Sequence, residues 1–188
     1  MSPYLSFAQR NMQWVDAQMR APDGFVWDSY YPNPADNPCA PQMDTTGHVC
    51  EWRWTYSQGL VIGTDVLLHQ IMGDSQYIAD ATRTANAALY FTMDRIWAQP
   101  APFNAFFFRS FLALDGYAHD PRYFGACETY LDRVWREARD PATGFFNAGG
   151  IGLYDAKAGY GSLDHAAFVQ MFAYAVYMGS GLNGSSLR

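Results

Sequence analysis

The chain has 188 residues and a net charge of −6; charged residues make up only 16% of it and aromatic residues 17%. The aromatic content is too high for an intrinsically disordered chain. A net negative charge without any basic run argues against a nucleic-acid backbone or an anionic membrane surface as the partner. No apolar stretch reaches the roughly 18 residues expected of a membrane span, and the N-terminus lacks the pattern of a signal peptide.

Apolar periodicity predicts six helices, over residues 4–20, 56–72, 75–96, 104–118, 121–139 and 163–179. The first, third and fifth carry one apolar stripe opposite a polar face, which is typical of helices exposed on one side. The second, fourth and sixth are apolar nearly all round, which indicates burial on most sides. Strand alternation is nearly absent, and residues 24–31 and 144–150 are expected to form short extended pieces in loops.

The connections between these helices alternate in length. Two-residue turns, Gly73-Asp74 and His119-Asp120, join an apolar helix to the amphipathic helix that follows it. The other connections, about 21–55, 97–103 and 140–162, are long. In an antiparallel helix layer this pattern collects every long loop at one end, the rim, where binding sites are usually built.

Two sequence echoes indicate that the αα-hairpin is a repeated unit. "GDSQYI" at 73–78 matches "HDPRYF" at 119–124, and "RAPDGF" at 20–25 matches "RDPATGF" at 139–145. Each of the second pair reads as a helix stop and a loop entry. We therefore expect an all-α single domain over 1–188, with three αα-hairpins and six main helices forming half of an (α/α)6 toroid.

The sequence contains three cysteines and does not show whether any two of them form a disulfide. Cys39 and Cys50 lie in one Pro-rich loop and are equally compatible with a disulfide and with free thiols. Cys127 lies in a helical pattern and is expected to be a small core residue.

Several segments, taken in order, resemble glycoside hydrolase family 76, the endo-α-1,6-mannanases. "WTYSQGLVIGTDVLLHQIMGDSQYIADATRTANAAL" at 54–89 is similar to that family's W-T-Y-N-Q-G entrance, apolar inner helix, G-D-x-x-Y-L turn and Ala-rich outer helix. "FNAFFFRSFLAL" at 103–114 resembles its next inner helix. "DPATGFF" and "LDHAAFVQMFA" resemble its last loop and last inner helix. The resemblance covers essentially the whole chain and implies the C-terminal half of the toroid.

The sequence departs from the family pattern at important positions. The resemblance implies a catalytic Asp-Asp pair in the N-terminal half of the toroid, and this sequence contains no adjacent aspartates. Ser57 stands where the family usually has Asn, and Asn104-Ala105 stand where it has Lys-Gly. No catalytic residue is assigned, because a retaining glycosidase needs two carboxyls about 5–5.5 Å apart.

The resemblance places Trp54, Tyr56 and Gln58 at the glycan cleft. An aromatic face suits the C–H groups of a sugar, and Tyr and Gln can bond its hydroxyls; the alternative is a packed helix entrance. Asp44 and Asp164 are further substrate-binding candidates on the long-loop rim, with loop solvation or helix capping as the alternative.

Other polar residues receive structural interpretations. Arg109, inside an apolar helix, is expected to be buried and paired with Asp65 or Asp115. His69 and His119 lie near the short turns and are expected to be structural. The four histidines show no metal-ligand spacing, so neither a metal nor another cofactor is expected.

We therefore expect a carbohydrate-active protein resembling an endo-α-1,6-mannanase, incomplete because the Asp-Asp pair is missing. The alternatives are a catalytically silent glycan-binding module and a structural half that functions only as a dimer or with a partner chain. The expected partners are an α-mannan or related glycan and a second chain, most simply a homodimer, covering the inner helices. The localisation stays open, because the resemblance is compatible with a secreted protein but the sequence carries no signal-peptide pattern.

Overall fold

The computed structural model describes residues 2–39, 47–147, 154–157 and 159–179, and the side chains of all of these except residues 91–94. Within these residues it has six α-helices: α1 (Pro3–Gln18), α2 (Thr55–Met72), α3 (Ser75–Arg95), α4 (Ala101–Asp115), α5 (Pro121–Glu137) and α6 (Ser162–Gly179). Every helix end lies within three residues of its predicted position. The all-α prediction is confirmed.

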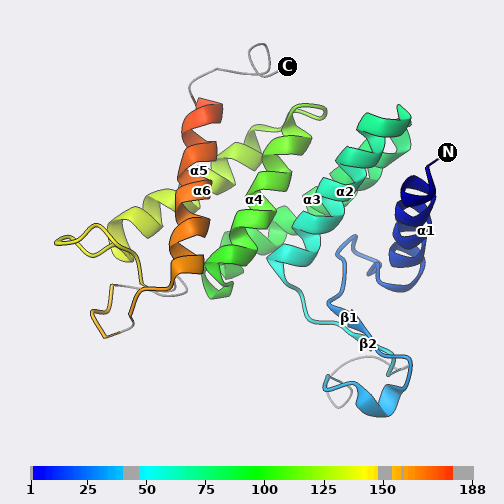
Figure 1. Cartoon of the computed structure of the whole chain (residues 1–188), viewed down its shortest axis with the longest axis horizontal. Coiled ribbons are helices and arrows are strands. Elements are labelled where there is room, and N and C mark those ends of the chain that lie inside the picture. Colours follow the sequence, from blue (N-terminus) through cyan, green and yellow to red (C-terminus); the bar gives the residue numbers. More distant parts are fainter. Residues whose placement is uncertain (1, 40–46, 148–153, 158, 180–188) are drawn as a thin grey trace.

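The helices form two layers (Figure 1). In the inner layer α4 lies between α2 and α6, and all three begin at the lower end of the view. In the outer layer α3 packs behind α2, and α5 packs behind α4 and α6. α1 lies at one edge, where Met12 and Met19 pack with Val61 and Leu68 of α2. This is the predicted alternation of outer and inner helices.

Large aromatic side chains of α4 build the core. Phe107, Phe108 and Phe111 are fully buried. Phe111 lies 4.9 Å from Tyr123, and Phe108 lies 5.5 Å from Tyr130, between ring centroids. Burial of each such ring contributes about 1.5–3 kcal/mol, so α4 and α5 are held together mainly by aromatic packing.

The predicted repeat is visible as repeated local geometry. Asp74 caps α3 by accepting a 2.9 Å hydrogen bond from the backbone N of Gln76, and Asp120 caps α5 in the same way through Arg122. The segments that follow the C-terminal ends of α1 and α5 match as well. Arg20 forms an antiparallel bridge with Val26, and Arg139 forms one with Phe146.

Short pieces of regular structure interrupt the long connections. β1 (Ser29–Tyr30) pairs antiparallel with β2 (Val49–Cys50), and a 3-10 turn, η1 (Pro34–Asp36), lies between them. A second 3-10 turn, η2 (Ile96–Ala98), follows α3. β1 confirms the extended piece expected in residues 24–31. The described residues of the segment from β1 to β2, 29–39 and 47–50, extend away from the helices (Figure 1) and are called the arm below.

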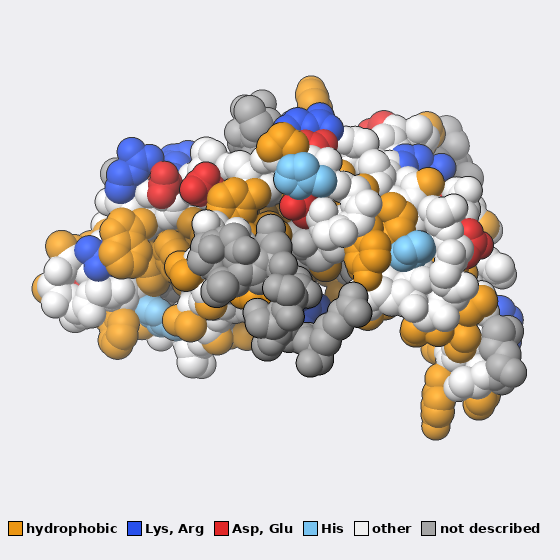
Figure 2. Space-filling view, turned by 90° about the horizontal axis from the view of Figure 1, so that it is seen from above, with side chains coloured by type: hydrophobic (Ala, Val, Ile, Leu, Met, Phe, Trp, Pro, Cys, Tyr) orange, Lys and Arg blue, Asp and Glu red, His pale blue; other side chains and the backbone are white. Residues whose placement is uncertain are grey.

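The inner helices leave one apolar face uncovered. Six exposed apolar side chains lie on these three helices, together with the exposed Arg109 of α4: Leu60, Leu67, Ile71, Phe106, Val169 and Val176. From above, most charged side chains in view lie along one long edge of the molecule, and hydrophobic side chains reach the surface elsewhere (Figure 2). Exposed apolar side chains gathered on one side are typical of a protein–protein interface. Among the described residues, no helix is long and apolar enough to cross a membrane.

Candidate glycan-binding rim

The N-terminal ends of α2, α4 and α6 lie at the same end of the molecule, and the described parts of the long connections gather there (Figure 1). This confirms the predicted rim. The two-residue turns lie at the opposite end, where His69 Nδ1 is 2.8 Å from the carbonyl of Asp74 and His119 bonds to Asp115. Both histidines therefore lie away from the rim, at the end where the sequence placed them.

Gln58 fixes the loop that follows α1. Its side chain is buried, and its amide donates to the carbonyl of Val26 at 2.7 Å while accepting from the Val26 backbone N at 2.8 Å. The same amide nitrogen donates to the carbonyl of Trp54 at 3.2 Å. The side chain thus pairs with the backbone as a neighbouring strand would, and it holds residue 26 against the first turn of α2.

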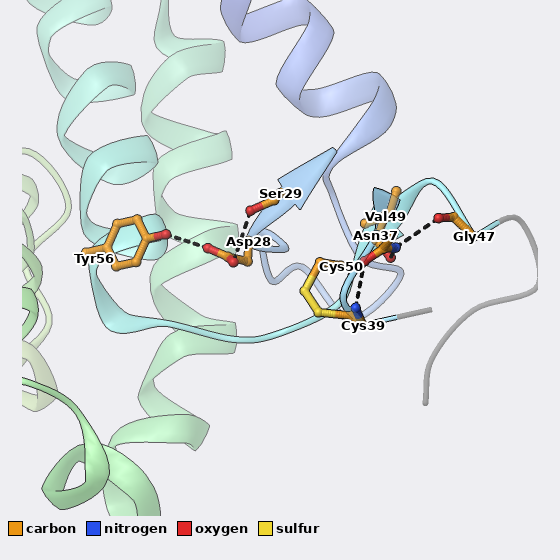
Figure 3. Close-up of a disulfide and its surroundings, with 8 residues drawn as sticks. All are labelled: Asp28, Ser29, Asn37, Cys39, Gly47, Val49, Cys50 and Tyr56. Carbon is orange, nitrogen blue, oxygen red and sulfur yellow. Dashed lines mark hydrogen bonds between the residues drawn. A yellow bond between two sulfur atoms is a disulfide. The ribbon is translucent and has the colours of Figure 1, made fainter. Parts of the chain in front are cut away.

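Tyr56 and Asp28 are brought together by that anchor. The Tyr56 hydroxyl donates to Asp28 Oδ1, and Ser29 Oγ donates to Asp28 Oδ2 at 3.0 Å (Figure 3). Burial, together with the hydrogen bond to Asp28, raises the pKa of Tyr56. Asp28 is half-buried and carries a carboxylate whose two oxygens are both engaged. In the sequence Asp28 is one residue of the long connection 21–55, and nothing there indicates that it pairs with Tyr56.

A disulfide ties the arm to this pair. Cys39 and Cys50 are bridged, with their Cα atoms 5.3 Å apart (Figure 3). The backbone N of Asp28 donates to the carbonyl of Cys50 at 3.1 Å, directly before the β1–β2 pairing. Asn37 closes the arm by donating to the carbonyls of Gly47 and Val49. The disulfide settles the open question about these two cysteines and limits the motion of Asp28.

Four aromatic rings surround the start of α2. Trp54 lies edge-on to Trp52 at 6.0 Å and to Phe103 at 5.8 Å, and Tyr56 lies 4.5 Å from Phe103, between ring centroids. Trp52 is exposed, whereas the other three rings are half-buried. Phe103 was missed in the sequence because it looks like one more apolar residue of α4. Its position in the first turn of a rim helix is the signal that could have identified it.

Buried hydrogen bonds set the spacing of the helices beneath this surface. Thr55 Oγ1 donates to Asn104 Oδ1 at 2.9 Å, and Asn104 Nδ2 donates to the carbonyl of Ile96 at 3.2 Å. Thr55 also donates its backbone N–H to Gln99 Oε1. These bonds fix the first turn of α2 against α4, so the aromatic rings rest on a rigid base.

The remaining predicted residues lie in different places. Asp164 is in the first turn of α6, partly exposed, with its carboxylate over Gly161, where a Cβ atom would collide with it. Asp44 lies outside the described residues. The prediction for Arg109 is wrong: its side chain is exposed, and its guanidinium lies 5.4 Å from the Phe106 ring centroid. An outward position on α4 lets this cation stay solvated without a carboxylate.

A family model described as Glycosyl hydrolase family 76 matches residues 1–180. A solved family 76 glycoside hydrolase from a bovine Bacteroides thetaiotaomicron strain has a TM-score of 0.71 and 21% identity, covering 93% of this chain and 39% of that one. An alpha-mannanase from Bacteroides thetaiotaomicron has a TM-score of 0.73 and 18% identity, covering 96% and 48%. No curated protein matches the chain.

A third solved structure is an alpha-1,6-mannanase from Salegentibacter sp., an inactive variant with two adjacent aspartates replaced by alanine, in complex with alpha-1,6-mannotetrose. Its TM-score is 0.66 at 18% identity, and the match covers 93% of this chain and 52% of that one. The chain thus spans about half the length of these structures or less. At these identities the likeness shows the shared fold: this chain has the architecture of half a toroid.

Proposed function

Because the chain belongs to glycosyl hydrolase family 76, we propose that its rim binds an α-1,6-linked mannan or a closely related glycan. The observation that supports this most strongly is the aromatic surface at the start of α2, where exposed and half-buried rings stand beside a fixed hydroxyl–carboxylate pair. A solved relative is described as bound to a four-mannose chain of this linkage.

Each rim residue has a distinct role in this proposal. Trp54 offers a ring to the C–H face of a sugar, and the Tyr56–Asp28 pair offers hydroxyl and carboxylate oxygens to its hydroxyl groups. Gln58 acts indirectly, because both ends of its amide are engaged with backbone groups. Asp164 adds a partly exposed carboxylate at the α6 end of the rim, and Asp44 remains a candidate outside the described residues.

We further propose that this chain alone does not hydrolyse the glycan. Hydrolysis needs a proton donor and a second carboxyl on opposite sides of the bond to be cleaved. The inactive Salegentibacter variant lacks two adjacent aspartates, and this sequence has no adjacent pair. Asp28 does not replace them by itself, because it is a single carboxyl group and glycoside hydrolysis requires two.

The uncovered inner face supports the proposal that the chain works as one half of a closed ring. Its exposed side chains lie on the inner helices α2, α4 and α6, where a toroid would place the opposite half. A homodimer is the simplest way to cover them, because a twofold axis lets the same patch cover itself. In such a ring the partner's rim would also face the glycan.

Calorimetric titration with an α-1,6-linked mannotetraose tests the binding proposal. Trp54→Ala is expected to raise Kd about tenfold, the loss of one well-placed aromatic contact. Tyr117→Ala is the matched control: it removes an exposed ring at the short-turn end and should leave Kd unchanged. Equal affinities for wild type and Trp54→Ala would contradict the assignment of the rim.

A further inference from the structure

The loop between α5 and α6 presents two aromatic rings to solvent at the other end of the rim. Phe145 is 52% exposed and Tyr160 is 45% exposed. Their ring centroids are 5.4 Å apart, and the ring planes meet at 69°. Two adjacent exposed rings on the rim give a ligand an aromatic surface to contact.

A buried carboxylate anchors this pair from below. Tyr160 donates its hydroxyl to Asp140 Oδ2 at 2.9 Å. Asp140 also accepts from Thr143 Oγ1 at 2.6 Å and from the backbone N of Ala142 at 2.8 Å. These hydrogen bonds, that of Thr143 first, hold the pKa of Asp140 down at about 2. The low pKa keeps this acceptor ionised near neutral pH, and the hydrogen bond to it orients the Tyr160 ring.

A histidine packs against both rings. His165, in the first turn of α6, lies 4.9 Å from Phe145 and 6.0 Å from Tyr160 between ring centroids. Its buried Nε2 has no hydrogen-bond partner among the described residues. The neighbouring Phe146 points the other way and packs 4.7 Å from the buried Phe168 ring. Phe145 and Tyr160 are thus held in place before any ligand arrives, which lowers the entropic cost of binding.

We propose that Phe145 and Tyr160 form a second sugar-contact site, which takes an uncharged hexose unit of the same glycan that binds at Trp54. Phe145 would face the C–H groups of the sugar, and the hydroxyls of Tyr160 and Tyr154, which lie 3.1 Å apart, would meet its hydroxyl groups. The anionic Asp140 beneath the rings disfavours a phosphorylated or acidic sugar. The inference rests on the proposed function and extends it along the rim from α2 to α6.

NMR of the full chain with 13C-labelled Phe and Tyr, titrated with an α-1,6-linked mannotetraose, tests this site directly. The ring signals of Phe145 and Tyr160 should shift saturably, while those of Tyr117 should not move. In calorimetry, Phe145→Ala should raise Kd about tenfold. Tyr160→Phe keeps the ring but removes the bond to Asp140, and it should weaken binding by a smaller factor. Unchanged chemical shifts elsewhere in each variant establish that it is folded.

The outcomes separate this site from the proposed function. Static Phe145 and Tyr160 signals, or an unchanged Kd in Phe145→Ala, while Trp54→Ala still weakens binding, would overturn the second site and leave the first in place. Failure of the wild-type chain to bind the tetrasaccharide at all would overturn both.

Discussion

Asp65 is a carboxyl group buried in the middle of α2. It is 2% exposed, and its Oδ2 has no hydrogen-bond partner among the described residues. Burial raises its pKa to about 7, repulsion from Asp16 adds to the rise, and attraction to Arg20 opposes it. A carboxyl in such surroundings is more stable protonated than ionised, so it links the stability of the fold to pH.

The direction of this link follows from the two pKa values. The unfolded carboxyl ionises near pH 4, but the folded one holds its proton until about pH 7. The stabilising contribution is therefore complete below about pH 4 and is lost as pH rises through 7. Between pH 5 and pH 8 the free energy of unfolding, measured with urea, should fall by roughly 2 kcal/mol more in wild type than in Asp65→Asn. Asp132→Asn, at an exposed position on α5, should behave like wild type; parallel losses in all three proteins would contradict the prediction.

Sequence reasoning located the rim residues better than it assigned their contacts. The position of Gln58 followed from the motif around it, yet its amide pairs with Val26, which lies 32 residues away along the chain. Asp28 and Tyr56 meet through the same long-range folding of a loop. A helix start is a local property, but the partner of a polar side chain depends on which loop returns to it, and periodicity does not carry that information.

At the scale of elements, the contact between α2 and α4 depends on glycine. A Cβ atom at Gly59 would lie 2.6 Å from the Cα of Phe107 and 2.8 Å from its backbone N, so the two helix backbones approach closely there. At Gly63 it would lie 2.9 Å from Ser110 Oγ. This approach brings the first turns of α2 and α4 together and sets the spacing between Tyr56 and Phe103.

Gly59→Ala should therefore destabilise the fold by about 1–3 kcal/mol, because backbone atoms rather than flexible side-chain ends would have to move. Gly125→Ala is the matched control, since α5 leaves open space around that position. It should be neutral or stabilise by about 0.5–1 kcal/mol through helix propensity. Chemical denaturation of both variants measures the difference, and a Gly59→Ala variant as stable as wild type would show that the helices are farther apart.

The helices themselves were predictable because their signals are local. Each of these signals acts within a turn or two of the chain. They are the apolar stripes, the Asp caps before α3 and α5, and the C-cap Gly73 that ends α2. The arm was not predictable to the same degree. Its strands are two residues long, and its stability comes from the Cys39–Cys50 bridge and from Asn37. The spacing of two cysteines in a loop did not reveal whether they are joined.

For the whole molecule, the exposed apolar face of the inner layer leads to a prediction about mass. Leu67, Ile71 and Val176 belong to a patch that water solvates poorly. Light scattering at micromolar concentration should give twice the mass of one chain. Leu67→Glu together with Val176→Glu should shift the protein to monomers while its helix content stays unchanged. A wild-type mass equal to a single chain would contradict ring closure by a second copy.

We propose that the rim of this chain binds a glycan and that the chain by itself does not hydrolyse it. The most direct test is incubation of the purified 188-residue chain with an α-1,6-linked mannotetraose, followed by chromatographic analysis of the products while binding is measured on the same sample. We predict saturable binding and an intact tetrasaccharide. Sustained release of shorter mannose oligosaccharides that Asp28→Asn or Asp164→Asn abolishes would contradict the claim, because it would show that rim carboxylates of this chain complete an active site.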